Sequence, residues 1–242
     1  MTAAAQKFPW DFDKPKTAFW DDIGWKEGRA FFGAFPDDAC AESTLADKLE
    51  SSTDLPTDAK LQILLDILQQ RLRDEEALAA DRVPPSSLVE SDYRAWRRLW
   101  HAIYVIKSHQ GRHDEEERII EMLMETQSSD GEKDLSAHHS MCFILVDKKR
   151  FEEAEVMCWD VLNWLDNHPM CGPSSPQSLS IRRLLVKIAC QTGSRDTAKR
   201  RLGELKALVD GLAKGKFAKY AEEEKEMLLD LTIENGLVEP AL

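Results

Sequence analysis

Apolar residues recur every three or four positions through most of the chain from about residue 50 onward, which is the period of one face of an amphipathic helix. The first such stretch follows Thr53 and Pro56, residue types that start helices. Its apolar face consists of Leu61, Leu64, Leu65, Leu68 and Leu72. Between residues 50 and 242 no segment shows the alternation typical of a strand, so the pattern predicts an all-α fold.

Further helices are expected along the rest of the chain. One starts at Ser86 or Ser87 after two prolines, and the next follows Asp114. Four more cover about 136–146, 151–165, 176–192 and 195–213, and a last helix begins near 216. Ser175 before Pro176 is a helix-start signature, because proline at the first helical position loses no hydrogen bond. The expected buried faces are Val89, Tyr93, Trp96, Trp100 and Ile103 in the second helix, Ile119, Ile120 and Leu123 in the third, and Tyr220, Met227, Leu228 and Leu231 in the last.

The chain also repeats itself. The segments that align are QGRHDEEERIIEML (110–123), KKRFEEAEVMCWDVL (148–162) and TGSRDTAKRRLGEL (192–205). Each has a turn residue, an acidic patch and a helix with apolar residues at matching offsets. The turn residues Gly111, Lys149 and Gly193 lie 38 and 44 positions apart.

Through these segments, over about residues 86–213, the chain resembles the tetratricopeptide repeat family, in its kinesin-light-chain-like variety. In that family a small residue five positions after the turn lets paired helices approach closely. Ala154 and Ala198 fit this pattern and Glu116 departs from it. The resemblance implies antiparallel helix pairs stacked into an α-solenoid with one extended concave surface. The alternative is an unrelated helical bundle.

On this reading residues 1–50 form an irregular aromatic N-terminal arm and residues 51–242 a helical-repeat domain. The core repeats occupy about 86–213, and a capping helix occupies about 216–237. The resemblance also assigns residues to the concave groove. They are Arg98, His101, Val105 and His109, then Ser136, His139, Phe143 and Asp147, then Ser180, Arg183, Lys187 and Gln191.

The groove positions contain several basic or protonatable side chains. His101, His139 and Arg183 occupy the same repeat position, and Lys187 lies one turn beyond Arg183. Such side chains make charge-assisted hydrogen bonds to carboxylates. We therefore expect a protein- or peptide-binding scaffold whose ligand is acidic. Its ligand-binding residues would be Arg98, His101, His109, His139, Phe143, Arg183 and Lys187. Alternatively, these are solvated charges paired with neighbouring acids.

One known ligand class of the family is not expected. Its co-chaperones hold chaperone C-termini with lysine, arginine and asparagine, but the asparagine positions are Val105 and Phe143 in this chain.

The stretch from Phe8 to Phe35 contains nine of the chain's nineteen aromatic residues and shows no helical pattern. Open exposure of so many aromatics promotes association, so we expect the arm to be covered. The expected contact residues are Trp10, Phe12, Trp20, Asp21, Asp22 and Trp25. The arm would cover the basic groove as an internal partner, cap the first helices, or serve as a linear motif for another protein.

The composition of the chain limits the classes of partner that we expect. Forty-four acidic and thirty-two basic residues give a net charge of −12, which disfavours nucleic acid and anionic membranes as partners. Five scattered cysteines, no signal-like start and no long apolar run lead us to expect reduced thiols and a cytoplasmic location.

The chemistry of individual residues points to no cofactor and no metal. His139 with Cys142 and His168 with Cys171 have helical spacing but match no established zinc pattern, and no phosphate-binding or nucleophile motif occurs. We therefore expect a binding protein rather than an enzyme. The enzymatic alternative is a cofactor-independent cyclase, isomerase or lyase. It would use His101, His139 and Asp147 on a hydrophobic small molecule enclosed between the arm and the helices.

Overall fold

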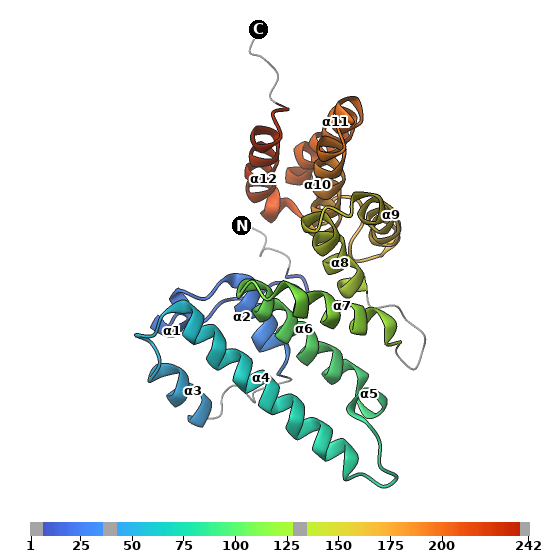
Figure 1. Ribbon diagram of the computed structural model, residues 1–242. Helices are drawn as coiled ribbons and strands as arrows, with labels where there is room; N and C mark the ends of the chain where they lie inside the picture. The colour runs from blue at the N-terminus through green and yellow to red at the C-terminus, as the bar shows by residue number, and fades with distance from the viewer. Residues whose placement is uncertain (1–6, 36–42, 128–134, 238–242) are drawn as a thin grey trace. The chain divides into compact units, whose positions relative to one another are not determined.

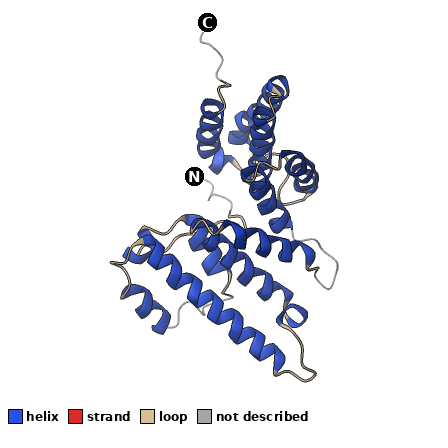
Figure 2. Cartoon of the chain, viewed as in Figure 1, coloured by secondary structure: helices blue, strands red, loops and turns tan. Residues whose placement is uncertain are grey.

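The computed structural model describes residues 7–35, 43–127 and 135–237 (Figure 1). These residues form helices and no strand (Figure 2), which confirms the expected all-α fold. The α-helices are α1 (Ala18–Asp21), α2 (Trp25–Gly33), α3 (Ser43–Glu50), α4 (Thr57–Ala80), α5 (Leu88–Ser91), α6 (Tyr93–His109), α7 (His113–Glu125), α8 (Leu135–Asp147), α9 (Phe151–Asn167), α10 (Pro176–Gln191), α11 (Arg195–Gly211) and α12 (Ala221–Glu234). The 3₁₀ helices η2 (Leu212–Lys214) and η3 (Ala218–Tyr220) lie between α11 and α12.

The chain forms two compact units. The N-terminal unit is Pro9–Ala137, and the C-terminal unit runs from His138 onward and includes Phe8. From Pro9 onward the arm shares a unit with the first helices, and residue 50 is not a boundary between the units. That residues 1–50 act as a separate domain stays a prediction. The sequence also predicts a linker at Ser128, Ser129, Asp130 and Gly131, which lie outside the described residues.

In the N-terminal unit α6 is the central helix, because α2, α4, α5 and α7 all pack against it. The leucine face expected in the first long helix is buried in α4, where Leu61, Leu64, Leu65 and Leu68 are fully covered. Ile119, Ile120 and Leu123 of α7 are also buried, as expected.

The arm is not irregular throughout, because it contains α1, α2 and α3. Its aromatic side chains pack on one another, with ring centroids 4.9 Å apart for Trp20 and Phe32 and 5.0 Å apart for Phe31 and Phe35. A Cβ at Gly28 would lie 3.3 Å from the Phe12 ring, so the glycine allows that ring to pack closely on α2. The aromatics supply a local core, and periodicity alone did not reveal the helices that this core stabilises.

In the C-terminal unit α10 packs against α9, α11 and α12. The N-cap expected at its start is confirmed. The buried Ser175 hydroxyl accepts a hydrogen bond from the Ser178 N–H at 3.2 Å, and Pro176 is the first helical residue. Phe8 also belongs to this unit, with its ring centroid 5.0 Å from that of Phe217.

The three aligned turns have the same backbone structure. Gly111, Lys149 and Gly193 have φ of 69°, 60° and 75° respectively, in the left-handed region. In each turn the next residue donates its N–H to the carbonyl five positions earlier, for example Arg150 to Leu145 at 2.8 Å. This is the bonding of a Schellman motif, which ends one helix and directs the chain into the next. The repeat read from the sequence is therefore a repeat in local structure.

The position five residues after each turn is buried in all three copies. Ala154 and Ala198 are 0% exposed, and Glu116 is 5% exposed. The Glu116 carboxylate lies 2.8 Å from Nδ1 of His113, which gives the buried acid a polar partner. Packed adjacent helix pairs are compatible with a helical repeat.

Two expectations about helices were wrong in detail. The helix expected from Ser86 or Ser87 through Ile103 breaks at Asp92, whose carboxylate accepts a hydrogen bond from the Ala95 N–H at 2.9 Å and so starts α6 anew. In the last helix Leu231 is buried, whereas Tyr220, Met227 and Leu228 are only half-buried. There α12 packs on α10 and α11 along one side only.

Candidate functional site

The expected groove residues fall in both units, so each unit is described by itself. In the C-terminal unit they lie on α8 and α10. Nε2 of His139 on α8 lies 2.9 Å from Oγ of Ser180 on α10, and this hydroxyl donates to the Gln177 carbonyl within α10. The contact brings together two expected groove positions from α8 and α10, helices that are separated in the chain by α9. Since the Ser180 hydroxyl donates to Gln177, the His139 nitrogen is the donor to Ser180.

Next to this contact the surface contains an aromatic ring and a cation. Phe143 is 37% exposed, and its ring centroid lies 5.3 Å from that of His139. Lys187 of α10 is half-buried and forms no ion pair within the described part of the chain. Asp147 and Gln191, at the ends of the two helices, are exposed.

Arg183 is engaged by the protein itself. Its guanidinium pairs with the carboxylate of Glu224 on α12, a residue only 3% exposed. Burial raises the pKa of Glu224 above its ordinary value, although the Arg183 charge acts in the opposite direction. The carboxylate that Arg183 was expected to take from a ligand is therefore supplied by α12.

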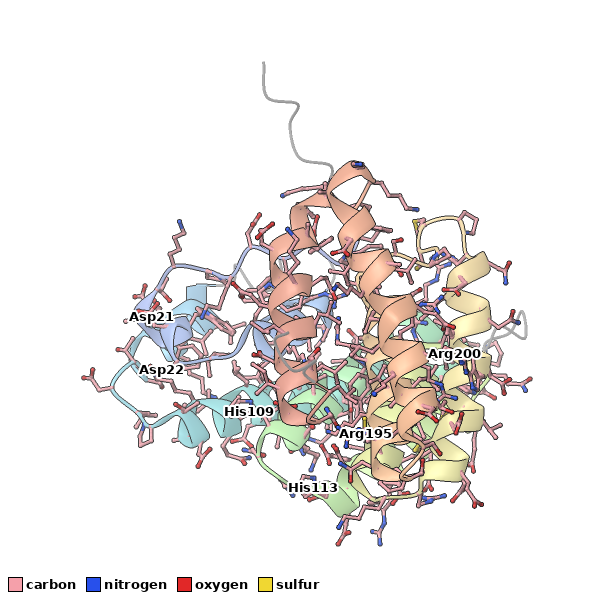
Figure 3. All side chains as sticks on the ribbon, turned by 90° about the horizontal axis from the view of Figure 1, so that it is seen from above. Asp21, Asp22, His109, His113, Arg195 and Arg200 are labelled. Carbon is pink, nitrogen blue, oxygen red and sulfur yellow. The ribbon has the colours of Figure 1, made fainter. Side chains whose placement is uncertain are left out.

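In the N-terminal unit the expected groove residues lie on α6, apart from Ser136 at the start of α8. Nδ1 of His109 lies 3.0 Å from the carboxylate of Glu27 on α2, which is 7% exposed (Figure 3). Arg98 is exposed and donates from Nε to the Arg94 carbonyl at 3.3 Å. His101 is half-buried beside Tyr104, with ring centroids 5.8 Å apart.

The arm residues singled out from the sequence have distinct environments. Trp20 is buried among Phe19, Phe31 and Phe32. Trp25 is 45% exposed and donates its indole N–H to the Phe12 carbonyl at 3.0 Å.

The remaining expected contact residues of the arm are Asp21, Asp22 and Trp10. Asp22 pairs at 2.6 Å with Nζ of Lys60 on α4, a lysine that is 1% exposed (Figure 3). Lys60 also lies over the Phe19 ring, 5.7 Å from its centroid. Asp21 is exposed, and Trp10 is half-buried. Through Asp22 and Glu27 the arm makes polar contacts with α4 and α6.

The residues of the enzymatic alternative are divided between the units. His101 belongs to the N-terminal unit, whereas His139 and Asp147 belong to the C-terminal unit, so a shared catalytic pocket stays a prediction. The buried thiols show no activation. The hydrogen bond with Cys158, followed by burial, raises the pKa of Cys142, and burial raises the pKa of Cys171 and Cys190.

The N-terminal unit has a pocket that the sequence did not reveal. Its volume is about 320 Å³, and its walls are Gln69, Leu72, Trp100, Ile103, Lys107, Glu115, Arg118 and Ile119. The buried Lys107 Nζ lies 2.5 Å from the Glu115 carboxylate, so this charge is already paired. None of the expected groove residues on α6 contributes to the pocket walls.

A fourth turn of the same kind, at Gly236, was not among the three turns aligned in the sequence. Gly236, after α12, has φ of 60°, and Leu237 donates its N–H to the Thr232 carbonyl, five positions earlier, at 3.0 Å. The sequence signal for this turn was a glycine that follows Gly193 at about the spacing between the other turn residues. By equivalence α12 corresponds to α8 and α10, and Glu224 stands where Ala137 and Ile181 stand in those helices.

None of the helices in the described ranges is both long enough and apolar enough to traverse a lipid bilayer. Within the same ranges no three His, Cys, Asp or Glu side chains gather closely enough to hold a metal ion. Comparison of the chain with protein-family models, with curated proteins and with solved structures gives no match, so the functional argument rests on the geometry of the chain itself.

Proposed function

We propose that this protein is a binding scaffold and that the face formed by α8 and α10 takes an acidic segment of another protein. The observation that carries the proposal is the contact between His139 and Ser180, because it joins expected groove positions from α8 and α10. A helical repeat that aligns such positions presents a continuous surface to an extended ligand.

Local charge supports an acidic ligand. The whole chain carries a net charge of −12, yet α8 and α10 together contain Arg182, Arg183 and Lys187, two histidines and one acid, Asp147. Arg182 pairs with Asp166 and Arg183 with Glu224, so the support for an acidic ligand comes mainly from Lys187. Lys187 lies on this face with no ion pair among the described residues. A charge-assisted hydrogen bond from it to a ligand carboxylate would contribute about 1.5–3 kcal/mol.

The ligand also needs an apolar or aromatic residue. The exposed ring of Phe143 lies next to His139 and offers a stacking surface. Aromatic pairs add about 0.5–1.5 kcal/mol beyond the area they bury. In the N-terminal unit Glu27 already pairs with His109, so the arm acts there as an internal acidic partner of α6.

Binding to immobilised acidic peptides, each with one aromatic residue, tests this function, with fluorescence anisotropy for the peptides that bind. We expect Lys187→Glu to weaken binding about tenfold or more, equivalent to about 1.4 kcal/mol. Lys206→Glu makes the same charge change at an exposed position of α11 and is the matched control. Failure of every acidic peptide to bind, or equal affinities for Lys187→Glu and the control, would refute the proposal.

A further inference from the structure

The exposed side of α12 has two large apolar side chains at its centre. Leu229 is 59% exposed and Ile233, one turn later, is 58% exposed. The buried residues Glu224 and Leu231 lie on the opposite side of this helix. The apolar pair therefore faces away from α10 and α11, the helices on which α12 packs.

The repeated turns identify what covers this position in the other helices of the C-terminal unit. Counting back from each turn, the residues equivalent to Leu229 are Cys142 and Val186, and those equivalent to Ile233 are Val146 and Cys190. Cys142 and Val186 are 0% exposed, Val146 is 4% exposed and Cys190 is half-buried. The positions that are open on α12 are thus largely covered on α8 and α10.

At Cys142 the second helix of the pair contributes to the cover. Cys142 on α8 is hydrogen-bonded to Cys158 on α9, and α10 packs along α11. After α12 the same turn is formed at Gly236. Leu229 and Ile233 therefore occupy the place where a second helix would pack.

The charged residues of α12 indicate what kind of helix would bind over Leu229 and Ile233. On α12 the exposed acids Glu226 and Glu222 lie in line with the apolar pair, one and two turns before it. Three more exposed acids, Glu223, Asp230 and Glu234, lie along one edge. The exposed Lys225 lies along the other edge and pairs with Glu222 at 2.7 Å. A symmetric contact with a second copy of α12 would place these acids against one another. A helix with basic residues along one edge of an apolar stripe would instead complement them.

We infer that the outer face of α12 is a docking site for a basic amphipathic helix of another protein. The incoming helix takes the second-helix position, buries Leu229 and Ile233, and places lysine or arginine opposite the α12 acids. This site is separate from the α8 and α10 face, so it stands or falls independently of the proposed function.

Two helices of the chain supply matched probes. Both α9 and α11 are second helices of 17 residues. The α11 sequence has five basic and three acidic residues, whereas the α9 sequence has five acidic and no basic residues. We expect a fluorescein-labelled α11 peptide to bind the full chain at least tenfold more tightly than a labelled α9 peptide.

Variants then locate the binding. Leu229→Ser combined with Ile233→Ser should weaken α11-peptide binding at least tenfold, without a lower melting temperature because both side chains are exposed. Val156→Ser, which changes a 66% exposed residue of α9, is the control and should bind as the wild type does. Equal binding of both peptides, or undiminished binding by the double variant, would overturn the inference. So would a wild-type dimer in sedimentation that the double variant abolishes, because the occupant would then be a second copy.

Discussion

Arg183 and Glu224 form an ion pair in which burial disfavours the ionised form of Glu224. The pair lies at an expected groove position, and its carboxylate comes from the same chain. Glu224 occupies a repeat position that is apolar in the neighbouring helices, and burial raises its pKa above the ordinary 4.5. An ion pair of this kind need not add stability, since desolvation can exceed the Coulombic gain.

This predicts a pH effect on stability. Because folding raises the pKa of Glu224, its stabilising contribution is present below 4.5 and is lost as the pH rises through the folded-state pKa. We expect the unfolding free energy of the wild type minus that of Glu224→Gln to fall as the pH is raised from below 4.5 toward neutrality. Urea unfolding at several pH values measures it. Glu226→Gln, at an exposed position of α12, controls for loss of a carboxylate, and a difference that rises with pH would contradict the account.

The same substitution bears on ligand binding. If Glu224 occupies Arg183 in place of a ligand carboxylate, its removal frees the guanidinium. We therefore expect Glu224→Gln to bind acidic peptides more tightly than the wild type, in contrast to Lys187→Glu. Fluorescence anisotropy with one peptide across the variants measures this. Weaker binding by Glu224→Gln would mean that Arg183 needs its partner to be positioned.

At the scale of elements, the sequence predicted the helices well where apolar period and turn chemistry agreed. Gly111 and Gly193 signalled left-handed turns, and Lys149 was placed with them by alignment alone. The arm was harder, because α1 and α2 depend on rings that meet from different parts of the segment. The groove contacts were also beyond prediction, since pairing Arg183 with Glu224 requires knowing which helix lies beside α10.

The turns give a direct test of backbone strain. A left-handed conformation costs a side-chain-bearing residue about 1–2 kcal/mol relative to glycine. We therefore expect Lys149→Gly to stabilise the protein by about 1 kcal/mol and Gly193→Ala to destabilise it by a similar amount. An added Cβ at Gly193 would meet no atom within 4 Å, so crowding is not a competing cause. Denaturant unfolding of the wild type and both variants measures these changes in stability. Effects of the same sign for both variants would contradict the assignment of the turns.

The aromatic cluster makes a second prediction at this scale. Phe31 is 0% exposed within the ring cluster, whereas Trp25 is 45% exposed beside it. Phe31→Ala should cost about 3–5 kcal/mol, as expected for a buried aromatic residue. Trp25→Ala should cost clearly less, because much of that ring stays in water. Thermal unfolding compares the two, and equal losses would mean that the cluster does not support the fold as described.

For the molecule as a whole, the arm from Pro9 onward is part of the N-terminal unit. It contributes α2 against α6, the Asp22 contact with Lys60 and the Glu27 contact with His109. Removal of residues 1–50 should therefore lower the melting temperature, because the α6 surface under α2 becomes exposed to water. Calorimetry measures the change. An unchanged melting temperature would show that the arm adds no stability.

The central claim is that α8 and α10 form the ligand-binding face. Photo-cross-linking tests it most directly, with a benzophenone in place of the aromatic residue of an acidic peptide that binds. The account predicts that mass spectrometry will find the cross-links on α8 and α10, around Phe143, and that Lys187→Glu will reduce their yield. Cross-links confined to α12 or to the pocket between α4, α6 and α7 would contradict it.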